Sequence, residues 1–311
     1  MKKVVITGAN GFVGSNTVSY FLKQGISVLG IDIGEKAKVL TNSDNYRYKQ
    51  CDISDRNELL KIISEDKYDT FVHFAWGGSA GKERQDYNLQ LKNAIDTVEC
   101  MKTARKAGCM RFVCAGSIME YEAEFVVRKQ GSRPGMGYIY GMGKYIAHCL
   151  CKMVAADIGI ELVWGLITNA YGVGEISPRF VNTTLRKIIN NELLQFTAAT
   201  QNYDFVYIDD VARAFYLVAE NGQSFCEYII GSSNARPLKE FIIEIQQEIA
   251  PNSIFKFGDI SFTGINMPLR VFDTLKTEND CGFKAEVSFV EGIRKTYEWL
   301  RNGGKINGSE I

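Results

Sequence analysis

The sequence predicts an α/β protein built on a doubly wound parallel sheet, with a smaller C-terminal lobe. Apolar runs alternate with helical patterns through the first half of the chain, at a spacing that favours right-handed crossovers between parallel strands. The runs are nearly continuous in apolar residues, as expected of strands covered by helices on both faces. Three glycines, Gly8, Gly11 and Gly14, directly follow the first run and predict the ligand-binding turn of a Rossmann-type sheet.

The predicted elements follow one another in strict alternation. The expected strands are 3–8, 27–32, 46–52, 70–75, 111–116 and 161–167. The expected helices are 11–24, 55–66, 85–107 and 140–158. We expect 1–172 to form the dinucleotide-binding domain, together with a returning segment near 203–222. The alternation ends after about residue 172, and we expect 173–311 to form mainly a second, smaller lobe.

Composition narrows the class of protein. The 311 residues carry 36 Lys and Arg against 36 Asp and Glu, so no basic surplus indicates a nucleic-acid partner or a membrane surface. The opening MKKVVITG is too short for a signal peptide, and no run approaches the roughly 20 apolar residues of a membrane span. A cytoplasmic protein is the simplest expectation. The eight cysteines are scattered without a C-x-x-C pair, which favours free, mostly buried thiols and no metal site.

The first predicted turn reads TGANGFVG, with glycines spaced G-x-x-G-x-x-G. Bare backbone at these positions lets N–H groups approach a pyrophosphate, and the helix N-terminus adds partial positive charge. Asn10, Phe12 and Val13 of this stretch are therefore candidate cofactor contacts beside the three glycines. The alternative is an ordinary turn between a strand and a helix.

Acidic residues end the second and third strands. A carboxylate at Asp32 would bind the adenosine ribose hydroxyls and repel a 2′-phosphate, which favours NAD over NADP. Lys36 and Lys38 follow closely and weaken this preference. Asp52 either accepts from the adenine amino group or caps a helix near Ser54, and the sequence leaves both readings open.

The stretch GYIYGMGKY carries the candidate reactive pair. Tyr140 and Lys144 are four residues apart at a helix start and share one face. A tyrosine that acts as a general base near neutral pH needs a pKa about three units below its usual value of about 10, or about 4 kcal/mol of differential stabilisation. A nearby ammonium and an oxidised nicotinamide supply such stabilisation. Ser117 ends the fifth strand, at the edge where parallel strands line a ligand crevice.

Three further features permit two readings each. His73 either touches the cofactor or completes the core. The glycines that follow Trp76 favour a mobile loop over the nicotinamide or the substrate, with Ser79 as a candidate substrate contact, rather than a plain surface connection. Glu120 and Glu122 either line a substrate site or face solvent, and solvent is the preferred interpretation.

In their order and spacing these motifs resemble the extended short-chain dehydrogenases/reductases, in particular the NAD-dependent nucleotide-sugar epimerase/dehydratase group. The matching stretches, which cover nearly the whole chain, are TGANGFVG, Asp32, CDI at 51–53, HFA at 73–75, Ser117 with Tyr121, YGMGK at 140–144, NAYG at 169–172, YDFVYIDDVA at 203–212 and EGIRKTYEWL at 291–300.

The resemblance implies roles for particular residues. It assigns acid/base chemistry to Tyr140, the cofactor ribose to Lys144 and hydroxyl donation to Ser117. It implies further cofactor contacts by Ile53, Phe74, Ala75 and Asn93, and substrate contacts by Ser117, Tyr140, Asn169 and Arg179. It implies in addition that 173–311 form mainly the substrate-binding lobe, and that the protein is a homodimer formed through the helices at 85–107 and 140–158.

Departures from the family pattern bear on the reaction. Family dehydratases carry Asp-Glu directly after the catalytic hydroxyl residue, and related decarboxylases use a glutamate at the second place, whereas this chain has Ile118 and Met119. We therefore expect a nucleotide-sugar epimerase, acting at C4 through a keto intermediate. A 4-keto reductase using NAD(P)H is the alternative, and a non-catalytic dinucleotide sensor is a second one. Leu166 and Tyr203 replace arginines common in the family, so the sequence leaves the particular nucleotide sugar and the stereochemical outcome open.

Overall fold

A seven-stranded parallel sheet forms the centre of the molecule. The computed structural model describes residues 1–39, 41 and 43–304, so the end of the predicted second lobe, 305–311, lies outside the described residues. The strand order is β11-β6-β5-β4-β1-β2-β3, and each neighbouring pair is parallel. The strands are β1 (Lys3–Thr7), β2 (Ser27–Asp32), β3 (Tyr46–Gln50), β4 (Thr70–His73), β5 (Arg111–Ser117), β6 (Glu161–Ile167) and β11 (Cys226–Ile230). The predicted doubly wound, Rossmann-type sheet is confirmed.

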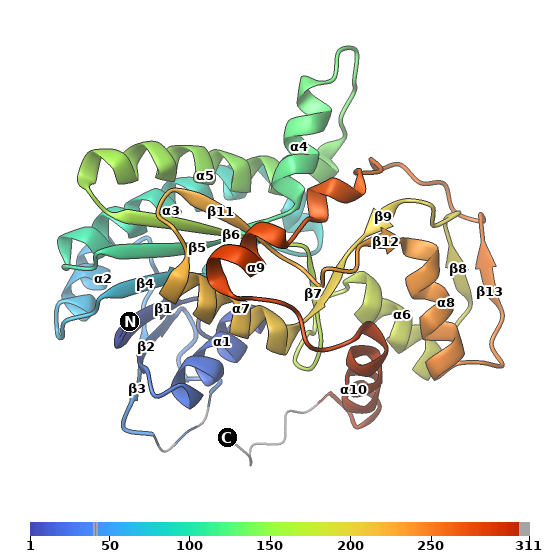
Figure 1. Cartoon of the computed structure of the whole chain (residues 1–311), viewed down its shortest axis with the longest axis horizontal. Helices are drawn as coiled ribbons and strands as arrows, with labels where there is room; N and C mark the ends of the chain where they lie inside the picture. Colours follow the sequence, from blue (N-terminus) through green and yellow to red (C-terminus); the bar gives the residue numbers. More distant parts are fainter. Residues whose placement is uncertain (40, 42, 305–311) are drawn as a thin grey trace.

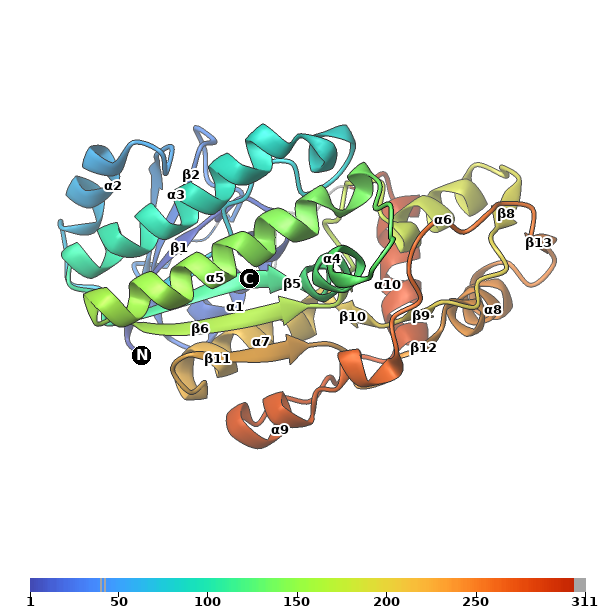
Figure 2. The ribbon, with the colours of Figure 1, turned by 90° about the horizontal axis from the view of Figure 1, so that it is seen from above.

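Helices cover both faces of this sheet (Figures 1 and 2). On one face α1 (Phe12–Lys23) packs beside α7 (Ile208–Asn221). On the other face lie α2 (Arg56–Ile63), α3 (Tyr87–Lys106) and α5 (Ile139–Ile158), with α3 and α5 side by side. The sheet is thus enclosed between two helical layers.

Successive residues of each strand enter different cores. Val4 and Ile6 of β1 pack in the cluster beneath α1 and α7, whereas Val5 packs beneath α2, α3 and α5. In β5, Val113 belongs to the first cluster and Phe112 to the second. Side chains alternate between the faces of a strand, and here both faces are covered. This is why the strands read as unbroken apolar runs.

The predicted strands and helices are confirmed, with ends that differ from the prediction by no more than three residues. Among the elements that were not predicted, two adjoin the predicted strands of the sheet. Helix α4 (Met119–Arg128) lies between β5 and α5 and projects away from the sheet (Figure 1). Strand β11 adds the outermost position beside β6 after α7 returns the chain to the sheet.

A second group of elements lies beyond the carboxyl ends of the strands (Figure 1). Its elements are β7 (Asn169–Tyr171), α6 (Phe180–Ile189), β8 (Leu194–Phe196), β9 (Asn202–Tyr203), β10 (Phe205–Tyr207), β12 (Arg236–Pro237), α8 (Leu238–Ile249), β13 (Phe255–Phe257) and α10 (Phe289–Arg301). Interlocking rings hold it together, since Phe241 contacts Phe205 and Phe289 edge-on, at centroid distances of 5.0 and 4.8 Å. A short helix, α9 (Leu275–Cys281), packs back against α7 and β11.

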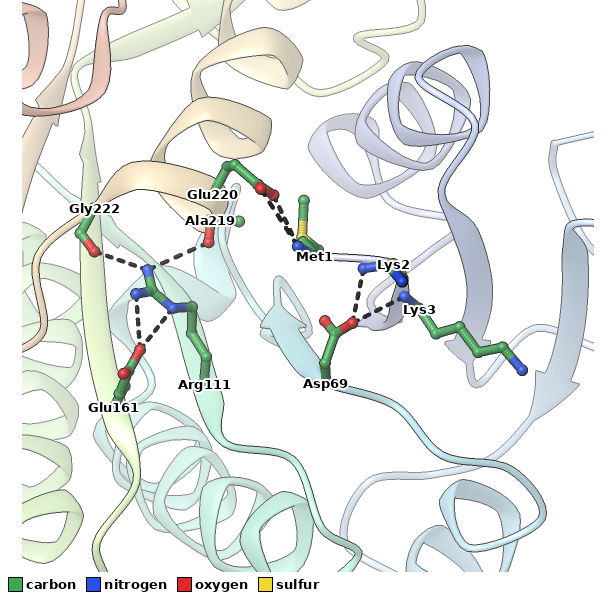
Figure 3. Close-up of polar contacts among 9 residues, drawn as sticks. All are labelled: Met1, Lys2, Lys3, Asp69, Arg111, Glu161, Ala219, Glu220 and Gly222. Carbon is green, nitrogen blue, oxygen red and sulfur yellow. Dashed lines mark hydrogen bonds and ion pairs between the residues drawn. The ribbon is translucent and has the colours of Figure 1, made fainter.

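Polar contacts close the opposite, amino edge of the sheet (Figure 3). Asp69 Oδ2 accepts from the backbone N–H groups of Lys2 and Lys3, at 2.7 and 3.2 Å. Arg111 Nη1 donates to the carbonyls of Ala219 and Gly222, at 3.3 and 2.8 Å, which satisfies the end of α7. The predicted reactive residues lie at the other, carboxyl edge of the sheet.

The structure bears on two expectations that were drawn from composition. The eight cysteines are free thiols, and most are buried, as expected. Within the described ranges, no helix has the length and apolar character needed to cross a membrane.

Candidate active site

The glycine turn between β1 and α1 is built by close backbone contacts. Gly8 has φ +68°, and a Cβ there would lie 2.7 Å from the backbone nitrogen of Ala75, while a Cβ on Gly14 would overlap the carbonyl of Gly8. Gly11 is the N-cap of α1 and offers no side-chain cap, so α1 presents its first N–H groups, beginning with Phe12 and Val13, to whatever lies before them. This arrangement fits an anionic pyrophosphate.

Asp32 and Asn10 shape the neighbouring end of β2. The Asp32 carboxylate accepts from the backbone N–H of Asn10 at 3.0 Å and from Gly34 at 3.2 Å. The Asn10 side chain in turn donates to the carbonyl of Lys36 at 2.9 Å and accepts from the N–H of Lys38 at 2.7 Å. Asp32 is thus fixed beside the glycine turn, where a ribose diol would meet it.

Asp52 does not cap α2, because the N-cap is Asp55, whose side chain accepts from the N–H of Glu58. Asp52 accepts from the Ser54 backbone at 2.9 Å and from the Ser54 hydroxyl at 2.8 Å, and these hydrogen bonds lower the pKa of its carboxyl. Its side chain is exposed, in the turn that precedes α2. Ile53 packs against the apolar cluster beneath α2. Contact of Asp52 and Ile53 with adenine stays a prediction.

His73 belongs to the core. Its Nδ1 lies 2.8 Å from Thr7 Oγ1 and its Nε2 lies 3.2 Å from Thr97 Oγ1, so both ring nitrogens are satisfied inside the protein. Burial, reinforced by the charge of Lys144, lowers the pKa of His73 to about 3. The core reading of this residue is therefore the correct one. The next residue, Phe74, packs edge-on against Phe215 at 4.7 Å.

The predicted reactive residues meet at the carboxyl edge. Ser117 is the last residue of β5, and Tyr140 and Lys144 lie one turn apart at the start of α5. All three side chains are largely buried. The Lys144 ammonium donates to the carbonyl of Ala115 at 2.7 Å and lies 3.8 Å from the ring centroid of Trp76. The Trp76 ring in turn lies edge-on to Tyr140, with centroids 6.3 Å apart.

The two glycines of YGMGK explain how α5 reaches this position. A Cβ on Gly141 would overlap the carbonyl of Met119, and a Cβ on Gly143 would lie 2.9 Å from Cβ of Gln90. These glycines therefore let the start of α5 press against α3 and against the segment that follows Ser117. The close approach holds Tyr140 next to the end of β5.

The glycine-rich loop after β4 is fastened to α3. Trp76 Nε1 donates to Gln90 Oε1 at 2.7 Å, and the Gln90 amide nitrogen donates to the carbonyl of Gly78 at 3.1 Å. Asn93 Nδ2 donates to the carbonyl of Gly77 at 2.8 Å, and Asn93 Oδ1 accepts from the Gly77 N–H at 3.1 Å. Ser79 is half-buried in this loop. Asn93 thus supports the loop beside the reactive pair, whereas the roles of Asn93 and Ser79 toward ligands stay predictions.

The expectation that Glu120 and Glu122 face solvent was wrong. Glu120 is 1% exposed, and its carboxylate accepts from the backbone N–H of Ser117 at 2.9 Å and from Trp164 Nε1 at 3.1 Å. Its other oxygen lies 3.1 Å from His148 Nδ1. Buried polar groups are tolerated when their partners are present, and Glu120 has three. This network fixes the backbone at the end of β5.

Glu122 and Arg84 are site residues that the sequence did not bring together. Arg84 comes from η1 (Lys82–Gln85), and its Cζ lies 4.5 Å from the ring centroid of Tyr140. Its Nη2 donates to Met119 Sδ. Burial raises the pKa of the half-buried Glu122 to about 7, against the influence of Arg84. Tyr203, at the position of a common family arginine, is near enough that its pKa is raised by burial and then by Glu122.

Two of the predicted substrate residues, Asn169 and Arg179, belong to the second group of elements. Asn169 Nδ2 donates to the carbonyl of Asp204 at 3.0 Å. Arg179 is the N-cap of α6, and its Nε lies 3.3 Å from the buried carboxylate of Glu175. The charge of Arg179 also acts on Arg84, which places the two guanidinium groups in one neighbourhood.

Comparison with known proteins agrees with this arrangement. A probable dTDP-glucose 4,6-dehydratase of Sinorhizobium fredii is 23% identical, over 97% of this chain and 93% of its own length. A dTDP-4-dehydro-6-deoxyglucose reductase of Escherichia coli is 22% identical, over 96% of this chain and 97% of its own length. A UDP-glucose 4-epimerase of Thermotoga maritima, crystallised with UDP-glucose, shares the fold with a TM-score of 0.81 at 19% identity, covering 97% of this chain and 100% of that chain.

These three proteins carry out different reactions, so the comparisons define a class of enzyme. The family model described as the NAD dependent epimerase/dehydratase family matches residues 4–231. That stretch runs from the first strand, through the glycine turn and the reactive edge, to just past β11. The chain therefore belongs to the NAD-dependent epimerase/dehydratase family of enzymes.

Proposed function

We propose that this enzyme is a nucleotide-sugar epimerase that inverts a sugar carbinol at C4 through a keto intermediate. One observation supports this proposal above the others. The glycine turn touches Ala75 through Gly8, Trp76 follows directly, and the Trp76 ring contacts both Tyr140 and Lys144. A dinucleotide bound at the turn would therefore lie close to Tyr140 and Lys144.

The residues present fit NAD. The N–H groups at the start of α1 suit the pyrophosphate, and the fixed carboxylate of Asp32 suits an unmodified ribose and opposes a 2′-phosphate. Bound NAD would supply the hydride acceptor and donor at the sugar carbon. Lys144 would hold the nicotinamide ribose by exchanging its hydrogen bond to Ala115.

Tyr140 would move the proton. Its phenol takes the proton of the reacting hydroxyl in one direction and returns it in the other. Ser117, whose backbone Glu120 fixes, would donate a hydrogen bond to the same oxygen. The cation of Lys144 on the same helix face favours the phenolate.

The second group of elements would bind the nucleotide diphosphate and sugar. Arg179 lies at the start of α6 and suits a phosphate, because a guanidinium forms paired hydrogen bonds with phosphate oxygens. We propose a UDP- or dTDP-hexose as substrate, in keeping with the UDP-glucose and dTDP-sugar names of the similar proteins.

Dehydration is disfavoured by the residues that follow Ser117. Ile118 is buried in a small apolar cluster with Met267 and Phe272. Met119 accepts a hydrogen bond from Arg84 through its sulfur. Neither side chain can transfer a proton. The two positions at which family dehydratases have Asp and Glu therefore hold no acid or base in this chain.

A single-direction 4-keto reductase is the second candidate, and one observation favours it. The Tyr140 ring is 9% exposed, with Trp76 at its edge and Arg84 on its face. A C4 epimerase must let the keto intermediate turn over inside the pocket, whereas a reductase needs no such space. Crowding around Tyr140 is therefore easier to reconcile with reduction.

Cofactor identification and a substrate panel separate the two candidates. Denatured protein is analysed for released dinucleotide, and native protein is assayed with UDP- and dTDP-hexoses and with a 4-keto sugar plus NADH. An epimerase interconverts C4 epimers without net NADH change, whereas stoichiometric NADH consumption identifies the reductase. Tyr140→Phe should abolish either activity. An active Tyr140→Phe variant would refute the proposed chemistry.

A further inference from the structure

Arg84 has an unusual environment for a half-buried cation. Its guanidinium lies over the face of the Tyr140 ring, 4.5 Å from the centroid. Its hydrogen bond in the described part of the chain goes to Met119 Sδ, a thioether and a weak acceptor. Burying a charge without a carboxylate at hydrogen-bond distance is costly. The contact with the aromatic face compensates in part, because the ring's negative quadrupole attracts the guanidinium.

Lys144, which is also near Tyr140, makes its contacts with other groups. The Lys144 ammonium donates to the carbonyl of Ala115 and lies against the face of Trp76. The ammonium of Lys144 therefore lies against the indole and the end of β5. Arg84 is the cation that lies over the face of the Tyr140 ring.

The Tyr140 ring is held from two directions by these neighbours. Trp76 meets it at an interplanar angle of 83°, and Arg84 covers its face. Trp76 and Arg84 both come from the segment between β4 and α3, which Gln90 fastens through the carbonyls of Gly78 and Glu83. The segment thus acts as a support for the tyrosine.

We propose that Arg84 is a positioning residue for Tyr140. It fixes the ring against Trp76, and its charge favours the phenolate form that must be present before Tyr140 can accept a proton. This inference rests on the proposed function, in which Tyr140 is the acid/base group.

Other charged and titratable groups face this pair and enter any pH profile. Around Arg84 these are Glu122 of α4, Tyr203 of β9 and Arg179 before α6. Glu122 also acts on Tyr138 of η2 (Met136–Tyr138). Ionisation of Glu122 at higher pH places a negative charge near Arg84 and opposes its effect on Tyr140.

Charge and shape at Arg84 are separated by two variants. Arg84→Met keeps the length of the side chain and removes the charge, and Arg84→Lys keeps the charge and removes the planar group. Lys82→Met, at an exposed residue of the same short helix, is the control, because it removes one positive charge that does not contact Tyr140.

Arg84→Met should lower kcat by roughly 10- to 100-fold with KM within about threefold, and should move the rising limb of the pH profile of kcat to higher pH. Arg84→Lys should recover part of kcat, and Lys82→Met should match the parent.

A spectroscopic measurement reports on Tyr140 without turnover. Protein with ¹³Cζ-labelled tyrosine is titrated by NMR, and Tyr140→Phe identifies the Tyr140 resonance. In Arg84→Met the midpoint of this resonance should move to higher pH by about one unit relative to the parent. In Lys82→Met it should not move. If no nucleotide sugar is turned over, the proposed function fails while this titration still tests the inference.

Three results would overturn the inference. One is an Arg84→Met protein that is folded by circular dichroism and has the parent titration of Tyr140. Another is an effect on KM alone in both Arg84 variants, which would make Arg84 a substrate-binding residue. A large loss in Arg84→Met with full recovery by Arg84→Lys and an unmoved titration would also contradict it.

Discussion

At the scale of single residues, the ionisation of Glu122 makes the stability of the folded protein depend on pH. Burial raises its pKa to about 7, above the ordinary value of 4.5. A group whose pKa is raised on folding contributes stability that is fully present below its ordinary pKa and is lost as the pH rises through the folded value. We predict that Glu122→Gln, which cannot ionise, has a higher Tm than the parent above pH 7 and an equal Tm at pH 4.5. Calorimetry across this range checks the prediction.

The exposed carboxyl of Glu298 on α10 provides the comparison for this experiment. Glu298→Gln should leave the pH dependence of Tm as in the parent. A Tm difference between Glu122→Gln and the parent that stays constant from pH 4.5 to 8 would show that ionisation of Glu122 is not its source.

Residue types and spacing predicted part of the site. The interval between Tyr140 and Lys144 implies a shared helix face, and the strand end implies the place of Ser117. Arg84 was missed because its position depends on a loop fastened by Gln90, and spacing carries no information about such a contact. Glu120 was placed wrongly because a charged side chain usually faces water, whereas two of its hydrogen-bond partners, His148 and Trp164, lie far from it in the sequence.

At the scale of elements, the fit of α5 against the end of β5 depends on Gly141. A Cβ at this position would overlap the carbonyl of Met119, a backbone atom that cannot turn aside. We predict that Gly141→Ala destabilises the protein by about 1–3 kcal/mol, despite the better helix propensity of alanine, and lowers kcat by displacing Tyr140. Urea unfolding and steady-state kinetics measure the two effects.

Gly137 offers a matched control in the same segment, since a Cβ there would meet no atom within 4 Å. Gly137→Ala should retain parent stability and kcat. Equal behaviour of the two alanine variants would mean that the close approach of α5 to Met119 is not required.

The amino edge of the sheet supplies an element-scale prediction without consequences for chemistry. Arg111 joins β5 to β6 through Glu161 and to the end of α7 through the carbonyls of Ala219 and Gly222. We predict that Arg111→Met costs about 1–3 kcal/mol, because two partly buried carbonyls lose a charged donor. The kcat should not change, because the site lies at the opposite edge. Chemical denaturation with parallel kinetics tests both statements.

Glu161 separates the ion pair from the carbonyl contacts. Its side chain is half exposed, so Glu161→Gln should cost less than about 1 kcal/mol. If it cost as much as Arg111→Met, the ion pair rather than the end of α7 would account for the stability.

Helix α4 shows why one element escaped the sequence pattern. Its buried residues are Glu120, Ala123 and Val126, so a glutamate stands in the stripe that would otherwise read as apolar. Its N-cap, Ile118, offers no side-chain cap. The inner strands of the sheet, by contrast, read as apolar runs because both of their faces are covered, and these were predicted well.

At the scale of the whole molecule, the arrangement of the sheet was predictable and that of the second lobe was not. The alternation of strands and helices implies a doubly wound parallel sheet with right-handed crossovers. The second group of elements is joined by two- and three-residue ladders such as β12–β9, whose partners are set by long-range packing of rings such as Phe205 and Phe241. Short strands of this kind leave little pattern in the sequence.

The outer surface of α3 and α5 carries the last prediction, which concerns assembly. These helices lie side by side on one face (Figure 2). Ile95 is 54% exposed on α3 and Met153 is 70% exposed on α5, with Leu91 and Leu150 nearby on the same two helices. An exposed apolar surface that spans two helices favours a protein contact, and a second copy of this chain would form a four-helix bundle there.

We predict that the parent protein is a dimer at micromolar concentration and that Ile95→Glu and Met153→Glu each weaken the dimer at least about tenfold, because each buries an unpaired charge at the contact. Ile254→Glu, at a residue 78% exposed in the second lobe, should leave the association unchanged. Sedimentation velocity over a concentration series measures the association constants. A monomeric parent, or equal weakening by Ile254→Glu, would place the contact elsewhere. Because Tyr140 and Lys144 start the helix that carries Met153, loss of this dimer would also loosen the support of the reactive pair.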